Sequence, residues 1–165
     1  MSGEDLLAHI DLETRKIETE RIKSSLIRKW GGGSGLASAR IHREMESEAD
    51  PLGPSSVVWI TGGPFTGTIA PTSGRLEVVN KSALNGLFGH SNTGGKFGAR
   101  LRQAGWEGVV LRGISQDPVY LLITPKGIAF RSAAHLWGKD IWETEKMIGA
   151  ELGDPDLNKV KVLSI

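Results

Sequence analysis

The residues best suited to chemistry lie between positions 73 and 98, which read SGRLEVVNKSALNGLFGHSNTGGKFG. Six glycines occur in this stretch, together with the cationic residues Arg75, Lys81 and Lys96. Glycine loses more conformational freedom on folding than any other residue, so a glycine-rich segment needs a compensating reason. Tight turns are one reason, and a ligand that must approach bare backbone is another. Because Arg75 and Lys81 would bracket this surface, the stretch indicates an anionic ligand.

Residues 89–96, GHSNTGGK, come close to the phosphate-binding loop of nucleotide hydrolases. A second glycine stands where the loop requires lysine, and Phe97 stands where Ser or Thr would bind magnesium. These differences exclude an ordinary phosphate loop. Glycine amides at the start of a helix can still cradle an anion. A glycine turn without any ligand remains the alternative.

A second glycine-rich segment, GGGSGLA at residues 31–37, invites comparison with dinucleotide-binding motifs. Its spacing does not fit G-x-G-x-x-G, and no predicted strand precedes it. We therefore interpret it as a helix C-cap followed by a turn. A nucleotide-binding domain is accordingly the weakest of the functional hypotheses.

The other side chains offer little reactive chemistry. The chain contains no cysteine, which excludes disulfides, thiolate nucleophiles and iron–sulfur ligation by these residues. The four histidines, at positions 9, 42, 90 and 135, lack the spacing of a zinc site. We assign no residue a catalytic role.

Composition describes an ordinary globular chain. Its 165 residues suit a single domain over 1–165, and 39% hydrophobic residues suffice for a core. The net charge of +1 gives no broad field for nucleic acid or membrane, so neither is an expected partner. No apolar run approaches the roughly 20 residues that span a bilayer. The acidic N-terminus does not resemble a signal peptide, and we expect a cytoplasmic protein.

The elements that must position these residues follow from hydrophobic periodicity and turn signals. Strands are predicted at 8–12, 16–20, 57–60, 75–79, 109–111, 119–123, 128–130 and 160–165, and helices at 24–30, 36–46, 94–103 and 139–152. The order is not a regular alternation of strand and helix. It predicts an α+β fold with mixed or antiparallel sheets and a few helices.

Several longer segments, in one order along the chain, carry a family resemblance. They are WGGGSGLASARI, DPLGPSSVVWITGGPFTGTIAPTSGR, VVNKSALNG, SNTGGKFGARLRQAGWEGVVLRG, PVYLLI and HLWGKDIWETE. Together they resemble the N-terminal domain of the tungsten-containing aldehyde ferredoxin oxidoreductases. The resemblance implies an α+β domain that forms the base for a bis-pterin tungsten (or molybdenum) cofactor, with magnesium bridging the pterin phosphates. It also implies a 4Fe-4S cluster that passes electrons to ferredoxin while an aldehyde becomes a carboxylic acid.

The same resemblance implies roles for particular residues. The cofactor-binding set is Arg75, Lys81, Asn92, Thr93, Gly94 and Gly95. Arg75 would lie between pterin and cluster and hydrogen-bond both, which suits a planar fork of donors. The backbone carbonyl of Asn92 would bind magnesium, a hard cation that prefers oxygen. Gly94 and Gly95 would permit close approach, and Lys81 would help to neutralise phosphate.

Departures from the family pattern are local. Ala83 stands where proline is usual, Thr93 replaces serine, and Lys96 replaces a common aromatic residue. The last change either adds a charge near the cofactor or points to solvent.

Length is the larger departure, because family members are several times longer and carry their cluster cysteines and substrate pocket downstream. We therefore expect these 165 residues to be inactive alone and to need the remaining domains of the enzyme as partners, with ferredoxin as acceptor. Whether the chain forms a homo-oligomer stays an open question. The alternative is a non-catalytic stand-alone subunit or relic used in assembly or pterin handling.

Overall fold

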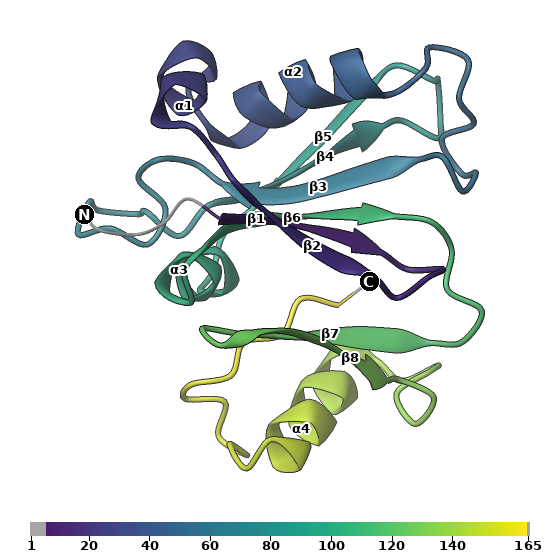
Figure 1. Cartoon of the computed structure of the whole chain (residues 1–165). Helices are drawn as coiled ribbons and strands as arrows, with labels where there is room; N and C mark the ends of the chain where they lie inside the picture. Colours follow the sequence, from purple (N-terminus) through teal and green to yellow (C-terminus); the bar gives the residue numbers. More distant parts are fainter. Residues whose placement is uncertain (1–5, 165) are drawn as a thin grey trace.

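The structure is a computed structural model that describes residues 6–164 (Figure 1). Its main sheet has six strands in the order β2-β1-β6-β3-β4-β5. They are β1 (Leu6–Asp11), β2 (Ile17–Arg21), β3 (Val57–Gly62), β4 (Leu76–Lys81), β5 (Phe88–Thr93) and β6 (Trp106–Arg112). β1 pairs parallel to β6, and the other neighbours pair antiparallel. A second sheet is the hairpin of β7 (Val119–Thr124) and β8 (Gly127–Ser132).

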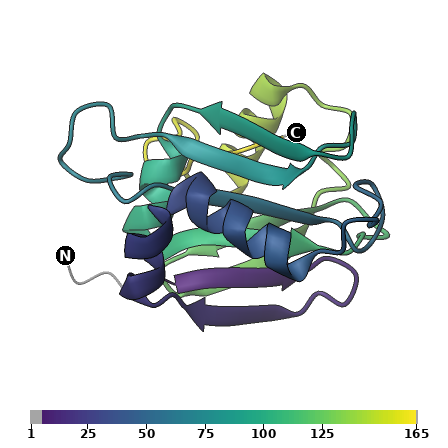
Figure 2. The same ribbon diagram turned by 90° about the horizontal axis from the view of Figure 1, so that it is seen from above.

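Helices lie on both sides of the main sheet. α1 (Ser24–Trp30) and α2 (Gly33–Glu44) cover one face, as Figures 1 and 2 show from two directions. α3 (Phe97–Gln103) and the β7–β8 hairpin lie against the other face, and α4 (Ile141–Glu151) lies beyond the hairpin. This arrangement confirms the predicted α+β class. None of the helices in the described part of the chain has the length and apolar character needed to cross a bilayer.

Two hydrophobic clusters hold these layers together. The cluster beneath α2 contains Trp59, Val79 and Val110, each at most 1% exposed. The cluster on the opposite face contains Leu76 and Val109 and extends to the β7–β8 hairpin. Adjacent residues of β6 thus pack into different clusters, because successive side chains of a strand point to opposite faces. The sheet is buried on both sides at its centre.

Two predicted helix starts need correction, and one strand was missed. α2 begins at Gly33, inside the GGGSG segment, because Gly31 alone provides the left-handed cap that ends α1. The predicted helix at 94–103 begins only at Phe97, and residues 94–96 form a loop. β5 was not predicted at all, since its residues are mostly polar or glycine.

The predicted final strand at 160–165 is wrong for residues 160–164, and Ile165 lies outside the described residues. The Asp154 carboxylate accepts the backbone N–H groups of Asn158, Lys159 and Val160, at 3.1, 2.7 and 2.7 Å. These bonds also lower the pKa of Asp154 below its usual value. A side chain therefore holds the backbone that follows α4, where a sheet ladder was expected.

Candidate functional site

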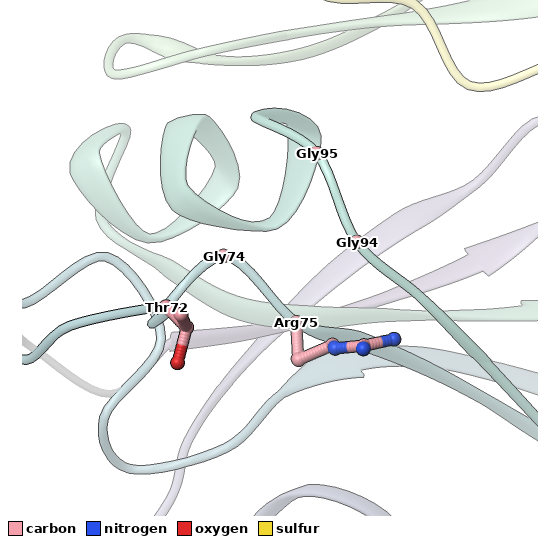
Figure 3. A pocket seen from close by; sticks show the side chains of 5 residues that line it. All are labelled: Thr72, Gly74, Arg75, Gly94 and Gly95. Atoms are coloured by element: carbon pink, nitrogen blue, oxygen red, sulfur yellow. The ribbon is translucent and has the colours of Figure 1, made fainter.

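The candidate site lies where the β4–β5 hairpin meets the loop before β4. The register pairs Leu76 with Thr93, so the backbone at Arg75 runs beside that at Gly94. A cavity of about 470 Å³ opens there, lined by Thr72, Gly74, Arg75, Gly94 and Gly95 (Figure 3). The structure thus brings together the cation and the two glycines that the sequence singled out.

Arg75 is the only charged side chain in the lining of this cavity. The side chain is exposed, and its Nη1 donates a 2.6 Å hydrogen bond to Oδ1 of Asn92. Within residues 6–164 the guanidinium makes no other hydrogen bond. Since a guanidinium carries five N–H donors in a fixed plane, most of them stay available to a ligand.

A buried hydroxyl holds the backbone of this arginine. Thr66, 5% exposed, accepts a 2.9 Å hydrogen bond from the N–H of Gly63 and donates one of 2.9 Å to the main-chain oxygen of Arg75. The loop after β3 is thereby tied to the residue that precedes β4. The cation projects from a backbone that is anchored on both sides.

The glycines serve two different purposes. A Cβ added at Gly74 would lie 2.3 Å from the main-chain oxygen of Gly95, so glycine is what lets the two loops touch. A Cβ at Gly94 or Gly95 would meet nothing within 4 Å, and Gly95 has a φ of +93°. These two residues therefore present bare backbone to open space, and the close approach of a ligand to them stays a prediction.

Lys81 lies at the opposite end of β4 from Arg75. Its Nζ donates to the main-chain oxygens of Ser47 and Ala49, the latter at 2.7 Å. It lines a separate cavity of about 300 Å³ beneath the end of α2. The structure does not bring Lys81 to the Arg75 cavity, so its predicted contact with phosphate is still only a prediction. Thr93 ends β5 beside Gly94 and does not line the cavity either.

Sequence reasoning missed Glu77 and His90, which complete the polar neighbourhood of Arg75. The Glu77 carboxylate accepts hydrogen bonds from Nδ2 of Asn92 and from Nε2 of His90. Alternation along β4 would have placed Arg75 and Glu77 on one face. Their partners could not be found without recognising β5. Among the described residues, no group of three or more histidine, aspartate or glutamate side chains is arranged to hold a metal ion.

Comparison with known proteins gives a family match over nearly the whole chain. A sequence model described as "Aldehyde ferredoxin oxidoreductase, N-terminal domain" matches residues 7–165. Two relatives named tungsten-containing aldehyde ferredoxin oxidoreductase, from Thermococcus kodakarensis and Pyrococcus furiosus, are 44% and 43% identical over 156 residues. This overlap is 94% of the present chain and 25% of each relative, so the chain spans about a quarter of their length.

More distant relatives carry other names. A Pyrococcus furiosus protein named "Aliphatic sulfonate oxidoreductase, WOR-like subunit" is 29% identical over 163 residues. A solved structure, the active site complex BamBC of benzoyl coenzyme A reductase with 1,5-dienoyl-CoA, superposes with a TM-score of 0.89 at 28% identity. The match covers 92% of the present chain and 23% of that one.

Proposed function

Because the chain belongs to the family of the aldehyde ferredoxin oxidoreductase N-terminal domain, we propose that it forms one wall of a tungsten-pterin cofactor site in a larger oxidoreductase. The observation that carries the proposal is the cavity in which the Arg75 guanidinium stands beside the open backbone of Gly94 and Gly95. A cofactor with phosphate groups needs cationic donors and close backbone approach, and this site offers both.

Each residue then has a definite part in holding the cofactor. Arg75 would hold the pterin through the N–H donors that its bond to Asn92 leaves free. Gly94 and Gly95 would leave room for it, since no atom of the described residues 6–164 lies within 4 Å of where their side chains would be. The side-chain amide of Asn92 is already bonded to Arg75 and Glu77. We therefore propose its main-chain carbonyl as the magnesium ligand, in keeping with the oxygen preference of that ion.

The bound tungsten centre would supply the redox chemistry, and these 165 residues would orient it. The proposed reaction is oxidation of an aldehyde to a carboxylic acid, with ferredoxin as electron acceptor. We favour an aldehyde because the relatives at 44% and 43% identity bear that name, whereas the sulfonate relative is 29% identical. A 4Fe-4S cluster would be bound by other parts of the enzyme, since this chain has no cysteine.

The loops around the cavity support a shared site. Phe65 is 73% exposed, and Ile69 of the same loop is fully exposed. Exposed apolar side chains next to a polar cavity are typical of surfaces that another part of a protein covers. We propose that the remaining domains of the enzyme cover this loop and complete the cofactor site. The non-catalytic alternative, a stand-alone protein for pterin handling, would leave the loop open.

Cofactor content tests the proposal. The chain would be purified from a host that makes the tungsten cofactor, alone and together with the remaining domains of a family member. Tungsten and magnesium would be read by elemental analysis, and pterin by fluorescence after oxidation. We expect bound pterin with the remaining domains, and a loss of at least about tenfold in Arg75→Ala, because a hydrogen bond to a charged group contributes roughly 1.5–3 kcal/mol.

Arg43→Ala is the matched control, since that arginine lies on α2 with a side chain 72% exposed. It should keep the pterin content of the original chain. Stoichiometric pterin in the chain alone would favour the pterin-handling alternative. Absence of pterin under both conditions would contradict the proposed site.

A further inference from the structure

A line of polar side chains runs along one face of the β4–β5 hairpin toward the cavity. Glu77 of β4 faces Asn92 of β5 in the strand register, and His90 lies two residues before Asn92 in β5. One Glu77 oxygen accepts from Nδ2 of Asn92, and the other accepts from Nε2 of His90. Asn92 in turn accepts from Nη1 of Arg75. The carboxylate is thus linked to the cavity arginine through one amide group.

Charge dictates which way this amide must point. The guanidinium can only donate, and the ionised carboxylate can only accept. Rotating the Asn92 amide by half a turn would set its NH₂ group against Arg75 and its oxygen against Glu77. Both contacts would then be unfavourable, and two charge-assisted hydrogen bonds would be lost. Asn92 therefore has one acceptable orientation as long as Glu77 and Arg75 stand on either side.

We infer that Glu77 is a positioning residue, which orients the Asn92 amide and through it holds the Arg75 guanidinium at the cavity. This inference rests on the proposed function, because it is the cofactor that would require a fixed guanidinium. Arg75 has no other side-chain anchor within residues 6–164. Holding it through a single Nη1 contact restricts the side chain and still leaves the other donors free for a ligand.

A simple surface ion pair between Glu77 and His90 is the rival explanation for the carboxylate. The two side chains are 18% and 38% exposed, and His90 stacks on Phe88 with ring centroids 6.1 Å apart. Exposed ion pairs contribute little to stability. In the rival explanation, removing Glu77 would disturb His90 and leave Arg75 unchanged. The two explanations therefore differ in what happens to the arginine.

Nuclear magnetic resonance of this chain can follow the arginine directly. The Nε–H signal of Arg75 would be assigned by its loss in Arg75→Lys, and its order parameter measured in each variant. We expect Glu77→Ala to lower that order parameter toward values below about 0.6, which are typical of flexible groups. Glu77→Gln keeps an oxygen that can accept from Asn92 and should restore most of the order.

A double-mutant cycle tests whether Glu77 acts through Asn92. Asn92→Ala alone should loosen Arg75 as much as Glu77→Ala does, and the double variant should loosen it no further. Glu18→Ala is the control, because Glu18 is an exposed carboxylate on β2 that pairs with Lys16. An unchanged Arg75 signal in Glu77→Ala would overturn the inference. So would an additional loss of order when Glu77→Ala is introduced into Asn92→Ala.

Pterin content separates this inference from the proposed function. In the cofactor-producing host with the remaining domains, Glu77→Ala should retain several-fold less pterin than the original chain, and Glu77→Gln should retain nearly all of it. Equal retention in Glu77→Ala would also overturn the positioning role. If neither the original chain nor any variant binds pterin, the proposed function fails. The resonance measurements alone then decide whether Glu77 orients Arg75.

Discussion

The Thr66 hydroxyl and the main-chain oxygen of Arg75 are joined by a hydrogen bond of 2.9 Å. The same hydroxyl accepts the N–H of Gly63, so one buried atom connects the end of β3 to the start of β4. Two hydrogen bonds therefore hold Arg75: Thr66 binds its backbone, and Asn92 binds its side chain. An exposed cation on a glycine-rich loop would otherwise sample many orientations.

Thr66→Val should lower the free energy of unfolding by about 1–3 kcal/mol, because it keeps the shape of the side chain and leaves two main-chain groups without their partner. Urea denaturation measures the change. Thr19→Val is the control, since Thr19 is exposed on β2 and should shift stability by no more than about 0.5 kcal/mol. Equal stabilities for the two variants would show that the Thr66 bonds are not needed to hold the loop.

Gly74→Ala and Gly94→Ala should differ in folding stability and agree in lowering pterin content. The first places a methyl group 2.3 Å from the main-chain oxygen of Gly95, so the loops must separate, at a cost of about 1–3 kcal/mol in folding stability. The second meets nothing within 4 Å and should leave stability unchanged while narrowing the cavity. Thermal unfolding distinguishes the two, and pterin content should fall in both. A Gly94→Ala variant with full pterin content would place the ligand elsewhere.

The sequence predicted the strands with clear apolar runs, because burial on both faces demands such runs. Val57–Gly62 is an example. Val119–Thr124 has a similar apolar run, although each of its residues is only half-buried. The sequence could not predict Phe88–Thr93, an edge strand whose residues are mostly exposed. That strand forms because its backbone pairs with the edge of β4. This pairing depends on the tertiary structure and leaves no apolar pattern in the sequence. The run at 160–164 indicated a strand, but within residues 6–164 no sheet edge pairs with it, and Asp154 binds the N–H groups of Lys159 and Val160 at its start.

The candidate site likewise combines residues that the sequence could indicate with residues that only the tertiary structure reveals. The glycine-rich stretch indicated an anion-binding surface, the family resemblance implied Arg75, Gly94 and Gly95 within it, and the structure brings these three together. Lys81 was included because it and Arg75 flank the predicted strand, yet the length of β4 separates the two residues. Glu77 could be recognised only from the register that sets it opposite Asn92.

Arg102→Ala should be among the most destabilising single substitutions in the chain. Arg102 of α3 forms an ion pair with Glu107 of β6, a carboxylate that is only 1% exposed. Removing the cation leaves a buried charge without compensation, which typically costs about 3–5 kcal/mol. Chemical denaturation would measure this loss. Arg43→Ala, at an exposed position, should cost less than about 0.5 kcal/mol. Adding Glu107→Gln to Arg102→Ala should recover part of the loss, and a failure to recover would point to lost packing instead.

The single tyrosine of the chain provides a test at high pH. Partial burial, and then a 2.7 Å hydrogen bond from its hydroxyl to Glu151, raises the pKa of Tyr120 from 10.0 to about 12. Because folding favours the neutral phenol, this stabilisation is complete below pH 10 and is lost as the pH rises toward 12. Absorbance at 295 nm should show tyrosinate forming near pH 12 in the folded chain and near pH 10 in denaturant. Glu151→Gln should lower the folded midpoint, because it removes the negative charge beside the phenol. A folded midpoint at pH 10 would show that the contact between β7 and α4 does not persist in solution.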